Sequence, residues 1–255
     1  MDRLKGKVAI VTGAGQGLGL AVAELFAKEG AKVIGTGHHV EKVDKAFALL
    51  KENNLEVTAM EQDVASEEDW KKVVAATVEK YGRIDILVNN AAIMTMKTLD
   101  ECSVDNFINV FKTNTLGAFL GIKYVYKEME KNGCGSIVNI DSIAGLTSGF
   151  ADGGDIAYSA SKGGTRSLTK NAAIFLSSKK IRVNSIHPAG ILTDMLKTVF
   201  ERTPELWEEV KVNSPLPPHI SDPMDVANGA LYLASEDSRT VTGSELVIDC
   251  GFMSH

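Results

Sequence analysis

The sequence predicts an α/β fold in which a parallel sheet of about seven strands carries helices on both faces. Short runs rich in β-branched residues alternate with longer stretches whose apolar residues recur at helical spacing. No linker, repeat or change of composition interrupts this alternation. We therefore expect a single domain over residues 1–255.

The predicted strands are short and continuously apolar, as is typical of strands that are buried on both faces. They cover residues 8–11, 32–34, 56–60, 84–88, 136–140, 182–186 and 245–248. The predicted helices cover residues 20–28, 40–51, 66–81, 104–131 and 157–177. Helical crossovers between successive strands are the usual connections of a doubly wound parallel sheet.

Two stretches depart from this alternation. Residues 146–155 form a loop rich in Gly and Asp, and residues 193–218 form a long segment with apolar residues at roughly helical spacing. Ligands of open α/β sheets bind at the carboxyl ends of the strands. We therefore interpret residues 193–218 as a lid on the substrate side, with a packed helical extension as the alternative.

Composition excludes several classes of function. The 255 residues carry a formal net charge of −6, which disfavours binding to nucleic acids or anionic membranes. No apolar run has the length of a membrane span or forms a signal peptide, so we expect a cytoplasmic protein. Cys102, Cys134 and Cys250 are far apart in the sequence and fit neither a disulfide framework nor a zinc site. We predict no metal site.

A glycine-rich turn, TGAGQGLG at residues 12–19, follows the first predicted strand. Glycine allows positive φ and a close approach of the backbone to a pyrophosphate, whose charge the N-terminus of the next helix favours. The glycine spacing is G-x-x-x-G-x-G, which differs from the usual G-x-G-x-x-G of dinucleotide sites. The predicted cofactor-binding residues of this turn are Gly13, Gln16, Gly17, Leu18 and Gly19. A purely structural turn is the alternative.

Tyr158 and Lys162 are one helical turn apart, so their side chains share one face of the predicted helix. A free phenol ionises near pH ~10, and a nearby ammonium favours the phenolate. Such pairs also occur by chance on helix surfaces. Ser142, which follows the fifth predicted strand, adds a hydroxyl that could bond a substrate oxygen beside the phenol. Together the three side chains predict acid–base chemistry.

The residues after the second predicted strand bear on the choice of cofactor. An acid there bonds the ribose 2′-hydroxyl of NAD, whereas an arginine accommodates the 2′-phosphate of NADP. Gly37 occupies the position of the acid and His38 that of the arginine, while Gln16 can donate but carries no charge. The pattern favours NADP and leaves NAD open. A solvent-exposed His38 without a ligand is the alternative.

With these residues in place, the chain resembles the short-chain dehydrogenase/reductase family over essentially its whole length. Within that family it is most similar to bacterial secondary-alcohol dehydrogenases and ketone reductases. The matching segments, in the order of the family, are residues 12–19, Asp63-Val64, Asn89-Asn90-Ala91, Asn114, Ser142, Tyr158 with Lys162, and residues 188–193. The resemblance implies a Rossmann fold. It also implies a homotetramer built partly from the predicted helices 104–131 and 157–177.

The resemblance also implies a role for each matching position. Tyr158 is the acid–base residue, Ser142 orients the substrate oxygen, Lys162 bonds the nicotinamide ribose, and Asn114 holds a water that relays protons. The further cofactor contacts it implies are Asp63, Val64, Asn90, Ala91, Ala92, Pro188, Ile191 and Thr193.

The chain departs from the family pattern at a few positions. Ala92 replaces a glycine, Asp141 replaces the serine that is usual before Ser142, and Ala189 replaces a proline. The interval between Ser142 and Tyr158 is also longer than usual. These departures leave the substrate open.

The predicted function is reversible hydride transfer between NAD or NADP and a secondary alcohol or ketone. The apolar residues of 193–218 suggest an apolar substrate, and hydroxysteroids are an alternative substrate class. Two other functions are a dinucleotide-binding protein without catalysis and a lyase or epimerase. The joint presence of Ser142, Tyr158, Lys162 and Asn114 argues against the first. The short segment after the sixth predicted strand argues against the second.

Overall fold

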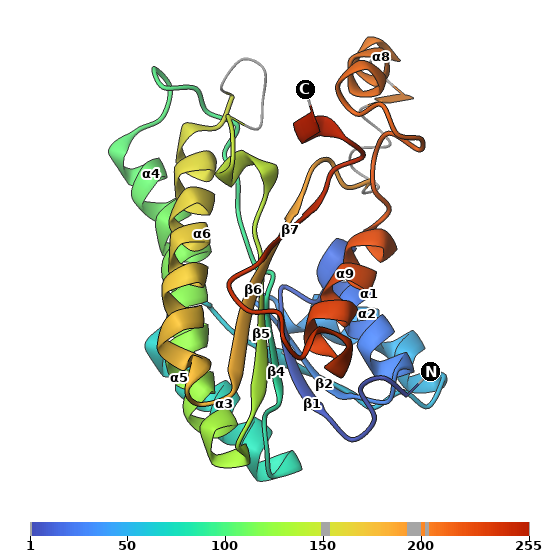
Figure 1. Ribbon diagram of the computed structural model, residues 1–255, viewed down its shortest axis with the longest axis vertical. Helices are drawn as coiled ribbons and strands as arrows, with labels where there is room; N and C mark the ends of the chain where they lie inside the picture. The colour runs from blue at the N-terminus through green and yellow to red at the C-terminus, as the bar shows by residue number, and fades with distance from the viewer. Residues whose placement is uncertain (1, 149–153, 193–199, 202–203, 255) are drawn as a thin grey trace.

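The structure is a computed structural model that describes residues 2–148, 154–192, 200–201 and 204–254. Its centre is a seven-stranded, all-parallel sheet in the order β3-β2-β1-β4-β5-β6-β7 (Figure 1). The strands are β1 Val8–Thr12, β2 Lys32–Gly37, β3 Val57–Glu61, β4 Ile86–Asn89, β5 Gly135–Ile140, β6 Ile181–Pro188 and β7 Glu245–Ile248. The doubly wound parallel sheet predicted from the sequence is confirmed.

Helices cover both faces of the sheet. One face carries α1 (Gly17–Lys28), α2 (Val40–Glu52) and α9 (Pro223–Ala234). The opposite face carries α3 (Glu67–Tyr81), α4 (Val104–Phe111), α5 (Gly117–Asn132) and α6 (Ile156–Ser177). Helix α8 (Pro204–Asn213) stands apart from both layers, near the C-terminal end of the chain (Figure 1). Among the helices of the described residues, none is both long and apolar enough to cross a membrane.

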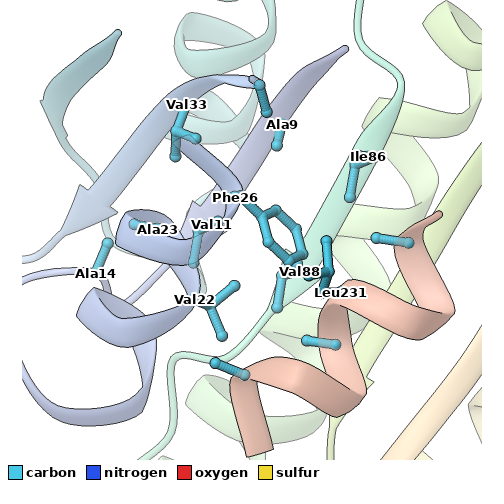
Figure 2. Packing of buried hydrophobic residues seen from close by; sticks show 14 of the residues in the cluster. Ala9, Val11, Ala14, Val22, Ala23, Phe26, Val33, Ile86, Val88 and Leu231 are labelled. Atoms are coloured by element: carbon cyan, nitrogen blue, oxygen red, sulfur yellow. The ribbon is translucent and has the colours of Figure 1, made fainter. Parts of the chain in front are cut away.

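Alternation along the strands divides the core into two clusters. In β1, Ala9 and Val11 pack on the side of α1, while Ile10 packs on the other side. Figure 2 shows Phe26 of α1 facing Leu231 of α9 in the first cluster. Because both faces of the strands are buried, their sequences are continuously apolar rather than alternating.

The predicted helix over residues 104–131 is helical throughout, but it is not a regular α-helix over its whole length. The chain forms α4, then a π-helical turn at Lys112–Leu116, and then α5. Asn114 lies in this turn, and its side chain bonds the backbone of Ile93. A π-helical turn is an unfavourable local conformation that is often found at functional sites. Here hydrogen bonds to distant parts of the chain hold it.

The order of the strands creates a crevice. The chain leaves β1 toward β2 and β3 on one side, then returns to place β4 on the other side of β1. The connections after β1 and β4 therefore run in opposite directions from neighbouring carboxyl ends. Open α/β sheets bind their ligands at such a switch point.

Candidate active site

A cleft of about 450 Å³ opens at the carboxyl ends of β1 to β4. The predicted cofactor residues that line it are Gly13, Gln16, Gly17, Leu18, Gly19, Gly37, His38, Asp63, Val64, Asn90, Ala91 and Ala92. The structure thus brings together residues that four different strand ends supply. Among the other lining residues are His39 and Lys42, which the sequence analysis did not single out.

Backbone conformation or lack of space requires glycine at each of the three positions of the G-x-x-x-G-x-G turn. Gly13 has φ +67° and Gly17 has φ +54°, a region that favours glycine. A Cβ on Gly19 would lie 2.2 Å from the carbonyl oxygen of Gly13, so only a hydrogen fits there. The turn consequently brings the N-terminus of α1 against the end of β1 and leaves a backbone cradle for phosphate groups.

The side chains of Thr12 and Asn90 form hydrogen bonds between the two sides of the crevice. The hydroxyl of Thr12 accepts from the backbone N–H groups of Asn90 and Ala91, both at 3.0 Å. The side-chain amide of Asn90 donates to the carbonyl of Thr12 at 2.8 Å. These bonds join the end of β1 to the end of β4, so the two walls of the cleft keep a constant spacing.

Tyr158 and Lys162 lie near the start of α6. The Lys162 ammonium is 5.5 Å from the centre of the Tyr158 ring. Lys162 is 3% exposed, and its ammonium donates to the carbonyl of Ile140 at 2.7 Å. A backbone carbonyl has no net charge, so it does not neutralise the ammonium, and the electric field of the buried cation acts on neighbouring groups. The ring of Tyr158 therefore lies near a buried positive charge.

Ser142 lies directly beyond β5, at the start of a short 3₁₀ turn that packs against α6. Its hydroxyl accepts from the N–H of Ala144 at 3.1 Å. Its carbonyl accepts from Nδ1 of His187 at 3.0 Å, so that nitrogen carries the proton. Burial lowers the pKa of His187, which favours the neutral ring. His187 thus supports the backbone of Ser142 from beneath.

Asn114 is buried between the loop after β4 and α6. Its oxygen accepts from the N–H of Ile93 at 2.8 Å, and its amide donates to the carbonyl of Ile93 and to the hydroxyl of Ser161, both at 2.9 Å. A cavity of about 10 Å³ that both Asn114 and Lys162 line is close to the smallest volume that holds one water.

The carboxylate of Asp155, which the sequence analysis did not single out, caps α6. It accepts from the N–H groups of Tyr158, Thr95 and Met96 at 3.1, 2.6 and 2.7 Å. Met96 has φ +53°, a strained conformation that these bonds hold. Asp155 therefore fixes the loop after β4 against the helix turn that carries Tyr158. An Asp three residues before a helical Tyr is the sequence signal that predicts such a cap.

Pro188 and Ile191, two further predicted residues, lie at and after the end of β6 and do not line this cleft. Pro188 ends β6, and Ile191 pairs with Ser221 in an isolated bridge. Thr193 lies outside the described residues, as does much of the predicted lid and part of the loop over 146–155. Among the described residues that follow, the ring of Trp207 in α8 contacts the rings of Phe200 and His219.

A glycine-lined cleft at the switch point of a parallel sheet, beside a buried lysine and a tyrosine, defines a dinucleotide-binding protein of the Rossmann type. The residues fit a dinucleotide, since side chains at Gly13 and Gly19 would collide with the end of β4 and with the turn itself, and the close-packed backbone cradle would be lost. Comparison with known proteins gives the family. The family model described as enoyl-(acyl carrier protein) reductase matches residues 13–253.

Curated relatives match over nearly the full length. The NADP-dependent (R)-specific alcohol dehydrogenase of Lentilactobacillus kefiri is 36% identical and covers 98% of each chain. The cyclopentanol dehydrogenase of Comamonas testosteroni is 35% identical and covers 100% of each chain. The 3-alpha-(or 20-beta)-hydroxysteroid dehydrogenase of Mycobacterium tuberculosis is 35% identical over 98% of this chain and 90% of the relative.

A solved structure described as a short-chain dehydrogenase/reductase from Burkholderia xenovorans superposes with a TM-score of 0.93. It is 35% identical and covers 99% of this chain and 98% of its own. The chain therefore belongs to the short-chain dehydrogenase/reductase family. The family predicted from the sequence is confirmed.

Proposed function

We propose that this protein interconverts a secondary alcohol and a ketone with NADP as its preferred cofactor. The observation that carries the proposal is the Tyr158–Lys162 pair, in which a buried ammonium lies 5.5 Å from the centre of the tyrosine ring. Ser142 begins the short turn that packs against the same helix. The relatives named above support the reaction, since each is named for a dehydrogenase that acts on an alcohol. When bound, the nicotinamide supplies or accepts the hydride.

The chain's own residues handle the substrate oxygen and the proton. In reduction, the hydroxyls of Ser142 and Tyr158 bond the ketone oxygen, and Tyr158 donates its proton to it. The ammonium of Lys162, which Ile140 holds, stabilises the resulting phenolate. In oxidation, the phenolate of Tyr158 takes the proton of the alcohol. A water in the small cavity beside Lys162 and Asn114 would return the proton to solvent.

A substrate panel tests this proposal. Purified protein is incubated with NADPH or NADH and a series of aliphatic, cyclic and steroid ketones, and consumption of the reduced cofactor is followed by its ultraviolet absorbance. We expect turnover of at least one class of ketone, faster with NADPH. Binding of the cofactor without turnover of any ketone or secondary alcohol would instead indicate a dinucleotide-binding protein.

The preference for NADP is supported by the charge beyond β2. Gly37, which stands at the position of the acid that bonds NAD, ends β2 and carries no carboxylate, and a Cβ there would lie 2.9 Å from a methyl of Val43. His38, His39 and Lys42 line the same part of the cleft. Lys42 is exposed and forms no ion pair with another described residue. It is therefore available for a 2′-phosphate.

Replacing Lys42 by alanine is expected to weaken NADPH binding by about tenfold, the effect of about 1.4 kcal/mol, and to leave NADH binding unchanged. Fluorescence titration of the purified protein with each cofactor measures both affinities. Lys45→Ala is the matched control, because Lys45 is exposed on the same helix and does not line the cleft. Equal losses for NADPH and NADH in Lys42→Ala would contradict a phosphate contact.

An apolar substrate is part of the proposal. Met94 and Met96, on the loop that Asp155 fixes beside Tyr158, are 45% and 57% exposed. Exposed large apolar side chains at the rim of a site are typical of apolar ligands. We assign residues 193–218, including α8, to the substrate side of a single domain as a lid.

The assembly and location also belong to the proposal. An apolar groove runs along α4 and α5, lined by Phe107, Ile108, Phe111, Leu116 and Phe119. Ile174 and Phe175 are exposed on α6. These helix faces support contacts between copies in a homotetramer. The three cysteines are free, as is usual for a protein of the cytoplasm.

A further inference from the structure

The carboxyl group of Asp141 is buried beneath the site. Asp141 follows β5 and directly precedes Ser142, and its N–H donates to the carbonyl of Ile186 at 2.7 Å. The residue is 2% exposed, and neither carboxylate oxygen has a hydrogen-bond partner of ordinary length and angle in the described residues. A buried carboxylate without a partner is costly and therefore rare in native proteins. The proposed reaction uses no group at this position.

The charged groups around Asp141 come from two elements, and a titratable histidine comes from a third. Lys162 and Arg166 face it from α6, and Glu245 faces it from β7. Glu245 is already paired with Arg166 and with Lys170, each at 2.8 Å. His187 of β6 bonds the carbonyl of Ser142, and its burial favours the neutral ring.

Lys162 differs from these groups because no carboxylate of the described residues lies within ion-pair distance of it. Its ammonium is bound to the carbonyl of Ile140, the residue before Asp141. The field of Lys162 therefore acts on two acidic groups, the phenol of Tyr158 and the carboxyl of Asp141. Whatever charge Asp141 carries changes the potential that Tyr158 experiences.

Burial raises the pKa of Asp141 to about 7, with Lys162 opposing the rise and Glu245 adding to it. The neighbouring N–H of Ser142 gives the charged form only weak support. The carboxyl group therefore changes its charge close to neutral pH.

We propose that Asp141 is a positioning residue whose charge sets how strongly Lys162 stabilises the phenolate of Tyr158. This inference rests on the proposed acid–base role of Tyr158. A neutral Asp141 leaves the full field of Lys162 to the phenolate. An ionised Asp141 offsets part of that field, so the phenolate forms at higher pH.

The pH profile of alcohol oxidation tests this coupling. In Asp141→Asn, the rising limb of kcat against pH is expected to move to lower pH by about one unit, since a nearby like charge has been removed. Asp141→Ser, which restores the residue usual in the family, should move it in the same direction. Asp85→Asn is the control, because Asp85 is a buried carboxylate that pairs with Arg83 at the opposite end of the sheet. An unmoved limb in both Asp141 variants overturns the proposal.

A second measurement needs no turnover. Carbon NMR of protein labelled at the aspartate carboxyl carbons should show one resonance that titrates near neutral pH and disappears in Asp141→Asn. In Lys162→Met its midpoint should move to higher pH, because the cation that lowers it is gone. If no aspartate titrates near neutral pH, or if Lys162→Met leaves the midpoint in place, the coupling is wrong. Failure of the substrate panel alone would contradict the proposed reaction and leave this measurement valid.

The pH dependence of thermal unfolding is a third test of the titration of Asp141. Because the pKa of Asp141 in the folded state is above its ordinary value of 3.8, its contribution to stability is full below that value and is lost as pH rises through about 7. Asp141→Asn should therefore raise Tm by several degrees at pH ~8.5 relative to its effect at pH ~5. An equal effect at both values would contradict a buried titrating carboxyl.

Discussion

Tyr158→Phe is expected to lower kcat for ketone reduction by about a thousandfold or more, while the affinity for the reduced cofactor changes by less than about twofold. General acid–base catalysis contributes roughly 10²–10⁴ in rate, and the substitution removes only the hydroxyl that performs it. The ring remains beside the ammonium of Lys162, so the packing of α6 is preserved. Steady-state rates and a cofactor titration on the same preparation measure the two quantities.

Tyr81→Phe is a matched control for this substitution. The hydroxyl of Tyr81 lies 3.2 Å from that of Thr58, at the end of α3 and away from the cleft. Its removal should leave kcat within about a factor of two, since surface substitutions away from a site usually have small effects. If Tyr158→Phe retained more than about a tenth of the rate, the proton would have to come from another group and the mechanism would be wrong.

Gly19→Ala should destabilise the fold by about 3 kcal/mol or more and abolish measurable cofactor binding. The added methyl would lie 2.2 Å from the Gly13 carbonyl oxygen and 2.6 Å from the side-chain nitrogen of Asn90. Forcing extra atoms into a packed region costs typically ~1–3 kcal/mol, and here the obstacle is backbone that cannot rotate away. Relief requires α1 to move from the end of β1, which removes the phosphate cradle. Urea unfolding and a cofactor titration test both parts.

Gly163→Ala supplies the matched control, because this glycine also lies inside a helix. A Cβ on Gly163 would meet nothing within 4 Å, so the variant should be about 0.5–1 kcal/mol more stable than the parent. A Gly19→Ala protein with the stability of the parent would show that the turn can adjust. Gly19 would then have no steric role.

The fold and the cleft were predictable because they depend on residues that are close together in the sequence. Strand β1 is apolar on both faces, and the glycines at 13, 17 and 19 follow it directly. The strand–turn–helix unit therefore predicts both the parallel sheet and the phosphate cradle. The Tyr158–Lys162 spacing places two side chains on one helix face regardless of what surrounds the helix.

The π-helical turn around Asn114 could not be predicted in this way. Residues 104–131 carry an uninterrupted helical pattern, and the bonds that hold the turn reach Ile93, 21 residues away, and Ser161, 47 residues away. Local propensity contains no information about partners at such separations. The same reason applies to the bond between the carboxylate of Asp155 and Thr95, which spans 60 residues, although the cap that Asp155 makes on α6 is local.

At Asp141, too, one property can be predicted from the sequence and another depends on tertiary packing. The sequence places an acid directly before Ser142 and marks it as a departure from the family pattern. Its burial with no hydrogen-bond partner of ordinary geometry among the described residues, and its position within the field of Lys162, arise only when β5, α6 and β7 pack together. The identity and order of the reacting groups follow from short-range spacing, whereas the charge and rigidity of their surroundings depend on contacts between distant segments.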